Sequence, residues 1–366
     1  MLNNTRKTCV NGVPDRQARS RTWRPSPGLL VAAILLLAPA DLCVRTDDGG
    51  PRKAGAAETT AAETARADLP AATRASLPAA TQTRRPGEQI AVRDYVVEPQ
   101  VAPQEKDAGP GRIISMAPSL TELCWAMGLG DRMVGRTQYC LYPPAARKVE
   151  VVGALLDPNI ERLLMLQPDL VLITAGSGML RDKFASLKLP VLTLPDSSLE
   201  DIYGAIRQLG DATKRPATAE ILIRSLRADL DRLRDQASRA VRPQKALVVT
   251  GALPNPPRGL WVAGPGSYLD SLLRLAGAKN AVEGDRAWLE IGAEQVLWLR
   301  PDVIVEVREP AYARHRDEAI AAWRKLPGLA KVRVVTLTDP AVLVPGPRVN
   351  VMLGKLIAGL SAEDAG

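Results

Sequence analysis

The sequence carries an internal repeat that constrains its fold more than any other feature. The stretch PNIERLLMLQPDLVLI at residues 158–173 returns as IGAEQVLWLRPDVIVEV at residues 291–307. Glu161 aligns with Glu294, 133 positions apart (294 − 161), and the Pro-Asp steps of the two stretches are separated by the same interval. Each copy reads as an acidic helix start followed by an apolar strand. We therefore predict two lobes that contain the same unit.

Short apolar runs alternate with helical patterns from residue 112 onward. The predicted strands are RIISMA, MVGRT, DLVLI and VLTL in the first half, and KALVVT, WVA, DVIVEV and VRVVTL in the second. Apolar strands separated by helices are typical of parallel sheets covered on both faces. The fold class is thus α/β, with two Rossmann-like lobes built on parallel sheets. In the first predicted helix, Ser119 and Glu122 have the spacing of a capping box.

The segment between the two halves predicts one long backbone helix. Residues 217–242 contain neither Gly nor Pro and place Leu222, Leu226, Leu230 and Leu233 on one stripe. At a rise of 1.5 Å per residue such a helix is roughly 35 to 40 Å long, which reaches across a whole lobe. The predicted first lobe, connecting helix and second lobe span residues 111–215, 216–242 and 243–361.

The first 45 residues have the pattern of an export signal. A basic segment precedes the apolar run GLLVAAILLLAPA, which is too short to span a bilayer comfortably and ends in an Ala38-x-Ala40 cleavage pattern. Because the basic segment is long, residues 1–45 also fit an uncleaved N-terminal anchor. We expect a periplasmic or otherwise extracytoplasmic protein, exported through this signal and either released or tethered to the membrane.

Residues 46–110 form a predicted tether. They are rich in Ala, Thr and Pro, and the sequence LPAAT occurs at both Leu69 and Leu77. Such a segment cannot bury enough apolar surface to offset the entropy of ordering it, so we predict disorder.

The composition excludes several kinds of site. The formal net charge is +8, but the basic residues are scattered and aromatic residues make up only 4% of the chain, which favours solubility over nucleic-acid binding. Four cysteines without a CxxC pair and a single histidine, His315, argue against a zinc or iron site built from side chains. We predict no metal site and no cofactor. The spacing leaves open whether Cys124 and Cys140 form a disulfide.

Two facing parallel sheets would leave a cleft at the carboxyl ends of their strands, where such sheets bind ligands. Four aromatic residues lie in or beside the loops at these ends: Tyr139, Tyr142, Trp261 and Trp288. Large rigid rings at a cleft suit a bulky, partly apolar ligand. The alternative is that each ring packs beneath its own loop.

No set of catalytic residues stands out. The sequence has no GxSxG elbow, no Cys/His pair, no phosphate loop and no full GxGxxG motif. Glu161 and Glu294 could be paired carboxylates, but each stands in the first turn of a helix at the end of its own lobe. They either interact with the helix dipole or provide a docking surface for a partner with two basic pockets. We expect a protein that is not an enzyme.

Four motifs carry a resemblance to a known family: RIISMAPSLTELCWAMGLGDRMVG, YPPAARKVEVVGALLDPNIERLLMLQPDLVL, GSYLDSLLRLAGAKNAV and AEQVLWLRPDVIV. In the same order, and over most of residues 112–360, they are similar to the substrate-binding proteins of ABC importers for cobalamin, iron-siderophores and haem, the type with one helix between the lobes. The resemblance implies lobes that close only slightly around the ligand. It also implies that arginine pockets of an ABC permease bind Glu161 and Glu294.

Within that family, the cobalamin-binding members are nearest in pattern. The resemblance implies ligand contacts by Tyr139, Trp288 and Asp339, whereas Leu155 and Thr174 stand where those members have tryptophan. We therefore expect a monomer that delivers a corrinoid to an ABC permease, with an iron-siderophore or haem as the alternative ligand. Any metal would lie inside the ligand. A two-lobed enzyme, such as a glycosyl transferase, and a tethered sensor or scaffold without a transporter are the competing hypotheses.

Overall fold

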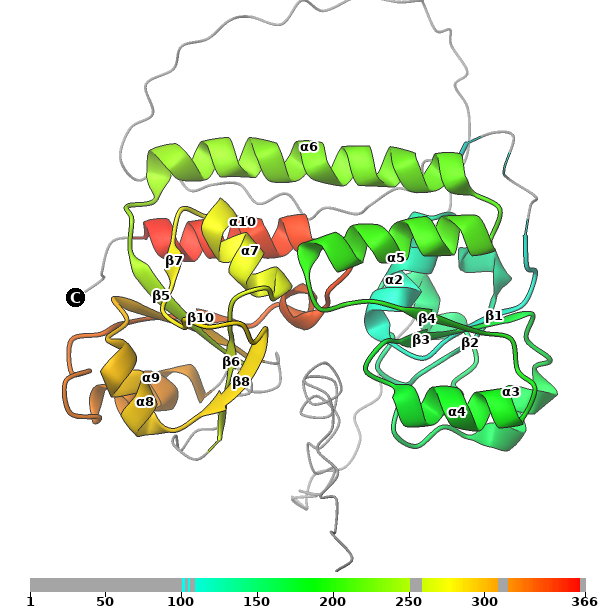
Figure 1. The fold of residues 1–366 in the computed structure, drawn as a ribbon, viewed down its shortest axis with the longest axis horizontal. Coiled ribbons are helices and arrows are strands. Elements are labelled where there is room, and N and C mark those ends of the chain that lie inside the picture. Colours follow the sequence, from blue (N-terminus) through cyan, green and yellow to red (C-terminus); the bar gives the residue numbers. More distant parts are fainter. Residues whose placement is uncertain (1–100, 103–104, 106–108, 251–258, 309–314, 363–366) are drawn as a thin grey trace, which may run out of the picture.

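Two α/β lobes lie side by side beneath one long helix in the computed structural model (Figure 1). The residues that the structure describes are 101–102, 105, 109–250, 259–308 and 315–362. The predicted signal or anchor and most of the predicted tether lie outside them. Helix α6, Pro216–Ala240, links the lobes and buries Leu222, Leu226 and Leu230 of the predicted stripe. The two-lobed α/β fold with a long connecting helix is therefore confirmed.

The first lobe contains a fully parallel sheet with the strand order β2-β1-β3-β4. Its strands are β1 (Ile113–Ser115), β2 (Met133–Arg136), β3 (Leu170–Thr174) and β4 (Val191–Leu194). Its helices are α2 (Pro118–Ala126), α3 (Ile160–Met165), α4 (Gly178–Ser186) and α5 (Leu199–Ala212), with short 3-10 helices η2 (Gly130–Arg132) and η3 (Pro144–Lys148). All four predicted strands of this half are present.

The second lobe contains a mixed sheet with the strand order β10-β9-β5-β6-β8, and β7 pairs with β5. Its strands are β5 (Lys245–Thr250), β6 (Leu260–Ala263), β7 (Lys279–Asn280), β8 (Trp288–Ile291), β9 (Val303–Val307) and β10 (Arg333–Leu337). Its helices are α7 (Tyr268–Leu275), α8 (Ala293–Leu299), α9 (Arg316–Arg324) and α10 (Val349–Ser361), with the 3-10 helix η5 (Pro340–Leu343).

The prediction of a parallel sheet was wrong for one edge of the second lobe. β6 runs antiparallel to both β5 and β8. Only residues 251–259 connect β5 to β6, and a parallel pair needs a crossover of about a dozen or more residues. The short connection therefore dictates the antiparallel edge. The sequence patterns did not predict β7, β8 or α10.

The repeat is reproduced in the backbone. Strand β9 lies 133 positions after β3 at both of its ends (303 − 170 and 307 − 174). Gln167 and Arg300, which occupy the same place in the two copies, both have positive φ, at 42° and 45°. Such angles are uncommon outside glycine, so the two copies share an unusual local conformation at the helix end.

The aspartate of each Pro-Asp step holds the start of the central strand. Asp169 Oδ2 accepts hydrogen bonds from the backbone N–H groups of Gly111 at 3.0 Å and Arg112 at 2.9 Å, just before β1. Asp302 Oδ2 accepts one from the N–H of Lys245 at 2.7 Å, where β5 begins. The Pro-Asp part of the repeat is therefore explained by folding.

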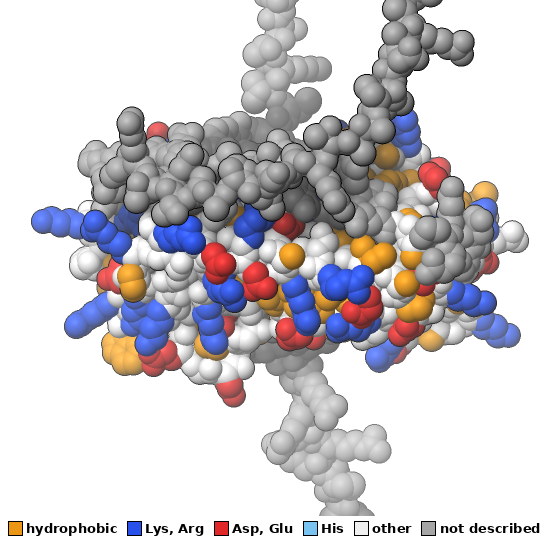
Figure 2. All heavy atoms as spheres, turned by 90° about the horizontal axis from the view of Figure 1, so that it is seen from above, with side chains coloured by type: hydrophobic (Ala, Val, Ile, Leu, Met, Phe, Trp, Pro, Cys, Tyr) orange, Lys and Arg blue, Asp and Glu red, His pale blue; other side chains and the backbone are white. Residues whose placement is uncertain are grey.

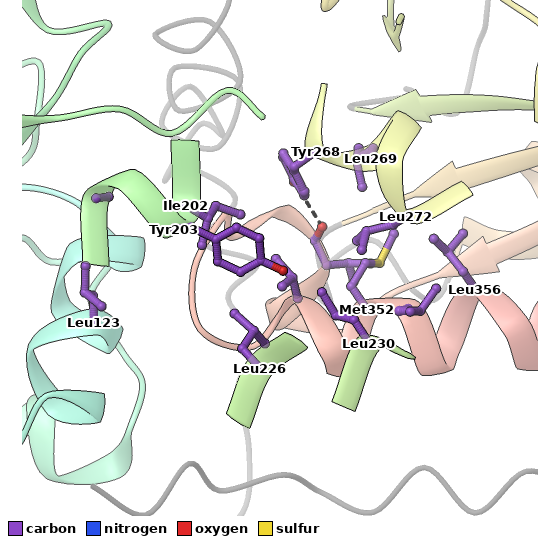
Figure 3. Close-up of a cluster of buried hydrophobic side chains, with 14 of the residues drawn as sticks. Leu123, Ile202, Tyr203, Leu226, Leu230, Tyr268, Leu269, Leu272, Met352 and Leu356 are labelled. Carbon is purple, nitrogen blue, oxygen red and sulfur yellow. Dashed lines mark hydrogen bonds between the residues drawn. The ribbon is translucent and has the colours of Figure 1, made fainter. Parts of the chain in front are cut away.

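One hydrophobic core contains residues of both lobes and of α6, and Figure 3 shows part of it. It joins leucines of α6 to side chains of α2 and α5 from the first lobe and of α7 and α10 from the second. The N–H of Tyr268, in α7, also donates to the carbonyl oxygen of Ser197 at 2.8 Å, which is a backbone bond between the lobes. Because close-packed side chains resist shearing, this shared core restricts how far the lobes can move apart.

A residue of the predicted tether caps α6. Glu105 is buried, and its carboxylate accepts hydrogen bonds from the N–H groups of Ala217 at 2.8 Å and Thr218 at 2.9 Å. Burial opposes ionisation, but these bonds hold the pKa of Glu105 below its ordinary value. The range 46–110 therefore includes a residue with a structural role, and the prediction of a disordered tether was wrong at this position.

The outer face of α6 carries charges of both signs. Arginine and lysine side chains are interspersed with acidic ones on this side of the molecule (Figure 2). Arg207 Nε, on α5, pairs with Glu220 Oε1 on α6 at 2.7 Å, and Arg234 Nη1 pairs with Asp231 Oδ1 at 3.0 Å. This mixed surface fits the interpretation of the net charge as a solubility feature.

Candidate functional site

Arg348, just before α10, connects the two lobes at their seam. Its guanidinium carbon lies 3.7 Å from the ring centroid of Tyr142, in the loop after β2. Its Nε donates to Glu122 Oε2 at 2.8 Å, and its Nη2 donates to Glu122 Oε1. Glu122 and Tyr142 belong to the first lobe and Arg348 to the second. One cation therefore joins a carboxylate and an aromatic ring across the seam.

The Glu122–Arg348 pair is shielded from solvent, since the two side chains are 3% and 9% exposed. Burial acts to lower the pKa of Arg348, but the hydrogen bonds with Glu122 raise it. Burial raises the pKa of Glu122 above its ordinary value, and the bonds from Arg348 offset only part of this effect. Because the guanidinium donates to both carboxylate oxygens, we assign both groups as ionised.

The prediction of a capping box at Ser119 and Glu122 was wrong. Helix α2 begins at Pro118, and its N-cap, Ala117, has no side-chain hydrogen bond. Glu122 instead faces Arg348. The sequence did hold a signal for this partner, because Arg348 is the only charged residue between Asp339 and Lys355, in a stretch that is apolar apart from Asn350. A lone charge in such a stretch indicates a buried partner.

Asp339, expected to contact a ligand, already has two partners. Its Oδ1 accepts a hydrogen bond from the N–H of Ala341 at 2.8 Å, and its Oδ2 lies 2.9 Å from Nζ of Lys355. Burial opposes ionisation, but the bonds from Lys355 and Ala341 hold the pKa of Asp339 below its usual value. Asp339 is thus a fixed negative charge near the seam.

Asp196 ends the equivalent strand region of the first lobe and has the opposite environment. Burial, and then the charge of Asp201, raise the pKa of Asp196 to about 6. The residue lines a cavity between the lobes together with Ser119 and Leu123 of α2 and Gly346 of the second lobe. Asp196 stands two residues after β4, as Asp339 stands two residues after β10, but among the described residues only Asp339 of these two is paired with a cation.

The four aromatic residues predicted at the cleft differ in the solvent exposure of their side chains. Trp288 is 6% exposed, and its ring centroid lies 6.0 Å from that of Tyr268, so most of its surface contributes to the core. Trp261 on β6, Tyr139 and Tyr142 are partly exposed. Most of the loop that opens the second lobe, residues 251–258, lies outside the described residues. Tyr142 contacts the opposite lobe, because its ring stacks against the guanidinium group of Arg348.

Cys124 and Cys140 are both buried and free, so the disulfide left open by the sequence is not formed in the structure. Burial raises the pKa of both thiols. Within the described part of the chain, no three His, Cys, Asp or Glu side chains gather as metal ligands would. The same residues include no helix with the length and apolar character needed to cross a bilayer.

Glu161 and Glu294 are exposed on α3 and α8, which lie on the side of the molecule away from α6 (Figure 1). Asn159 caps α3 by accepting a hydrogen bond from the N–H of Arg162 at 2.9 Å, and Gln295 accepts one from the N–H of Gly292 at 2.7 Å. Neither glutamate has an ion-pair partner among the described residues. Their charges are therefore available to a partner, and their places on separate lobes do not resemble a carboxylate pair in one active site.

Comparison with known proteins gives one consistent result. Residues 113–341 match the family model described as periplasmic binding protein. The chain is 31% identical over 247 residues to an uncharacterised ABC transporter substrate-binding lipoprotein of Bacillus subtilis, covering 65% of this chain and 76% of that one. It is 30% identical over 241 residues to the vitamin B12-binding protein of Yersinia pestis, covering 65% and 82%. A periplasmic haem-binding protein from Pseudomonas aeruginosa superposes with a TM-score of 0.57 at 27% identity, covering 69% and 93%.

Proposed function

The chain belongs to the periplasmic binding protein family, and on that premise we propose that it captures a corrinoid and delivers it to an ABC importer. The family places it outside the cytoplasm, as the substrate-binding component of an importer for a small molecule such as vitamin B12, haem or an iron chelate. Its role is binding rather than catalysis.

The arrangement at the lobe seam carries this proposal. Tyr142 presents an aromatic ring that is stacked on Arg348, and the Asp339–Lys355 pair lies at the end of β10. A large ring with polar substituents needs both kinds of contact, namely flat apolar surface and fixed charges that orient it. We propose that Tyr139, Tyr142, Trp261, Trp288 and Asp339 contribute the ligand contacts, with Trp288 offering only its exposed edge.

A corrinoid fits these residues better than haem because it does not require an axial ligand from the protein. Haem iron is commonly held by a histidine, cysteine, methionine or tyrosine side chain. The chain has one histidine, and the described cysteines are buried. Tyr139 and Tyr142 are the partly exposed groups in the predicted contact set that could ligate haem, so haem is the alternative to exclude.

The ligand can be identified by titrating the protein with cyanocobalamin, haemin and ferrichrome, using calorimetry and tryptophan fluorescence. We expect cyanocobalamin to bind and to change the fluorescence, since Trp261 and Trp288 lie in the proposed site. Tyr139→Phe and Tyr142→Phe should then leave cobalamin binding nearly intact. Haemin binding that is lost in either variant, with no response to cyanocobalamin, would show that the ligand is haem.

We also propose that Glu161 and Glu294 dock the protein on the permease. Each provides an exposed charge on its own lobe, and such charges set orientation and encounter rate more than affinity. In a proteoliposome uptake assay with cyanocobalamin, the double variant Glu161→Arg, Glu294→Arg should block uptake and leave cobalamin affinity nearly unchanged. Equal loss of uptake and affinity would mean that these residues hold the fold or line the ligand site.

Export through residues 1–45, as a cleaved signal or a retained anchor, is part of the proposal, with the protein acting as a monomer. Mass spectrometry of the protein recovered from its membrane and soluble fractions distinguishes the two forms. A mature chain that begins after Ala40 in the soluble fraction supports cleavage. Full-length protein found only in the membrane fraction supports an anchor.

A further inference from the structure

Two exposed hydrophobic side chains stand beside the proposed docking glutamates. Trp298 and Met165 are 84% and 74% exposed, the largest exposed fractions of any large hydrophobic side chain in the described part of the chain. Met165 follows Glu161 by four positions on α3, and Trp298 follows Glu294 by four positions on α8. Residues four apart lie on the same face of a helix. Each lobe thus presents an acid and an apolar side chain together.

The two hydrophobic residues occupy the same position in the repeat. Met165 and Trp298 are separated by 133 positions (298 − 165), as are Glu161 and Glu294. The residue types differ, but both are large and apolar at a site that is exposed to water in both lobes. Because a large apolar side chain occurs at this position in both lobes, we infer that the surface requires one there.

Folding does not account for these side chains. The inward positions of the two helices are filled by Leu163 and Val296, which are also repeat equivalents and are fully buried in separate cores. Met165 and Trp298 belong to neither core cluster. Exposed apolar area costs about 25 cal/mol per Å² relative to burial. These two side chains therefore do not stabilise the isolated protein through burial.

We propose that Met165 and Trp298 are the apolar anchors of the permease-binding surface, one on each lobe, and this inference rests on the docking role proposed above. The matching partner has two equivalent half-sites, each with an apolar pocket beside a basic group. A two-fold symmetric permease provides such half-sites. The pattern also follows the usual anatomy of protein interfaces, in which a few buried aromatic or methionine side chains contribute most of the binding energy and charges lie at the rim.

Charge and apolar anchor act on different kinetic steps, which makes the proposal testable. Rim charges mainly change the association rate and its salt dependence, whereas a buried anchor mainly changes the dissociation rate. We expect Trp298→Ala to weaken binding to the cognate permease in lipid nanodiscs about tenfold or more, chiefly through faster dissociation. Met165→Ala should have a smaller effect in the same direction, and Trp298→Phe should restore most of the affinity.

Two controls distinguish specific binding through this surface from non-specific hydrophobic adsorption. Met179, on α4, is 70% exposed and is not adjacent in sequence to either glutamate, so Met179→Ala is a matched control. Nanodiscs of the same phosphatidylethanolamine and phosphatidylglycerol composition without permease test for a lipid contact. Cyanocobalamin affinity and thermal unfolding should be unchanged in all of these variants.

The outcomes distinguish this inference from the proposed function. Wild-type affinity of the Met165→Ala, Trp298→Ala double variant for the permease, with loss in the Glu161→Arg, Glu294→Arg variant, would overturn the anchors and leave the function intact. Equal weakening by Met179→Ala, or binding to empty nanodiscs that Trp298→Ala abolishes, would also overturn it. A wild-type protein that binds cyanocobalamin but not the permease would remove both docking proposals, and one that binds no ligand and no permease would remove the function itself.

Discussion

Glu122 and Arg348 lie 226 positions apart in the chain and form a buried ion pair between the two lobes. Glu122 lies on α2 of the first lobe, and Arg348 directly precedes α10, the last helix of the second lobe. The lobes are therefore held together by a specific charge pair in addition to α6 and the shared core. A small change in the angle between the lobes would act directly on this contact.

Removing one member of the pair is expected to destabilise the protein strongly. Arg348→Met should lower the free energy of unfolding by about 3 to 5 kcal/mol, because it leaves Glu122 buried without its counter-ion. The double variant Glu122→Leu, Arg348→Met should recover part of this loss. Urea unfolding at pH 7 measures both. Arg207→Met, which breaks the half-exposed pair with Glu220, is the control and should cost less than about 1 kcal/mol. Similar losses at the two sites would contradict the assignment.

Asp196 should make stability depend on pH. Its pKa of about 6 in the folded protein exceeds the ordinary 3.8, so the folded state binds the proton more tightly than the unfolded state. The resulting stabilisation is present below about pH 4 and is lost as the pH rises through 6, to an extent of up to about 3 kcal/mol. Asp196→Asn should therefore stabilise the protein relative to wild type increasingly between pH 4 and 7.

Asp339 provides the comparison of opposite sign. Its pKa is lowered, so its ionised form stabilises the fold above the ordinary value and that stabilisation is lost as the pH falls through the folded value. Asp339→Asn should thus destabilise the protein at pH 7 and have less effect in acid. Urea unfolding of both variants across this range checks the pair. A constant difference between wild type and Asp196→Asn from pH 4 to 7 would refute the shifted pKa.

The aspartates of the Pro-Asp steps should contribute to stability and not to ligand binding. Asp302→Ala removes the acceptor for the N–H of Lys245 and should cost about 1 kcal/mol, with Asp302→Asn costing less because an amide oxygen can still accept. Asp211→Ala, at an exposed position of α5, should change the free energy by less than about 0.5 kcal/mol. Thermal unfolding and cyanocobalamin titration separate the two effects. Loss of ligand affinity without loss of stability would contradict the structural role.

Glu105 should stabilise α6 as a cap supplied from outside the helix. Glu105→Ala leaves the N–H groups of Ala217 and Thr218 without their acceptor and should cost about 1 to 2 kcal/mol at pH 7. Because the pKa of Glu105 is lowered, the difference from wild type should shrink as the pH falls below 4.5. Urea unfolding at pH 7 and pH 3 tests this. An unchanged midpoint at pH 7 would show that the cap contributes nothing.

The sequence predicted those helices and strands whose residues show a hydrophobic pattern within the element itself. The apolar runs that became β3 and β9 and the leucine stripe of α6 were predicted because burial of one face imposes a short, readable period. The resemblance to substrate-binding proteins of ABC importers is confirmed at the level of the family. Strand β8 was not predicted, because it forms by pairing with β6 at the edge of the sheet and no pattern in its own residues identifies that partner.

What the sequence determined by itself is the repeated unit, since the 133-residue offset links Glu161 to Glu294 and Asp169 to Asp302 before any coordinate is known. Only the tertiary structure separated the roles of these pairs, by showing the aspartates bonded to backbone and the glutamates exposed. It also decided that Glu122 meets Arg348 and that Asp339 has a lysine partner while Asp196 is held beside Asp201. The reason is physical: periodicity records which side of an element is buried, whereas the partner of a charge depends on distances between distant segments that only packing fixes.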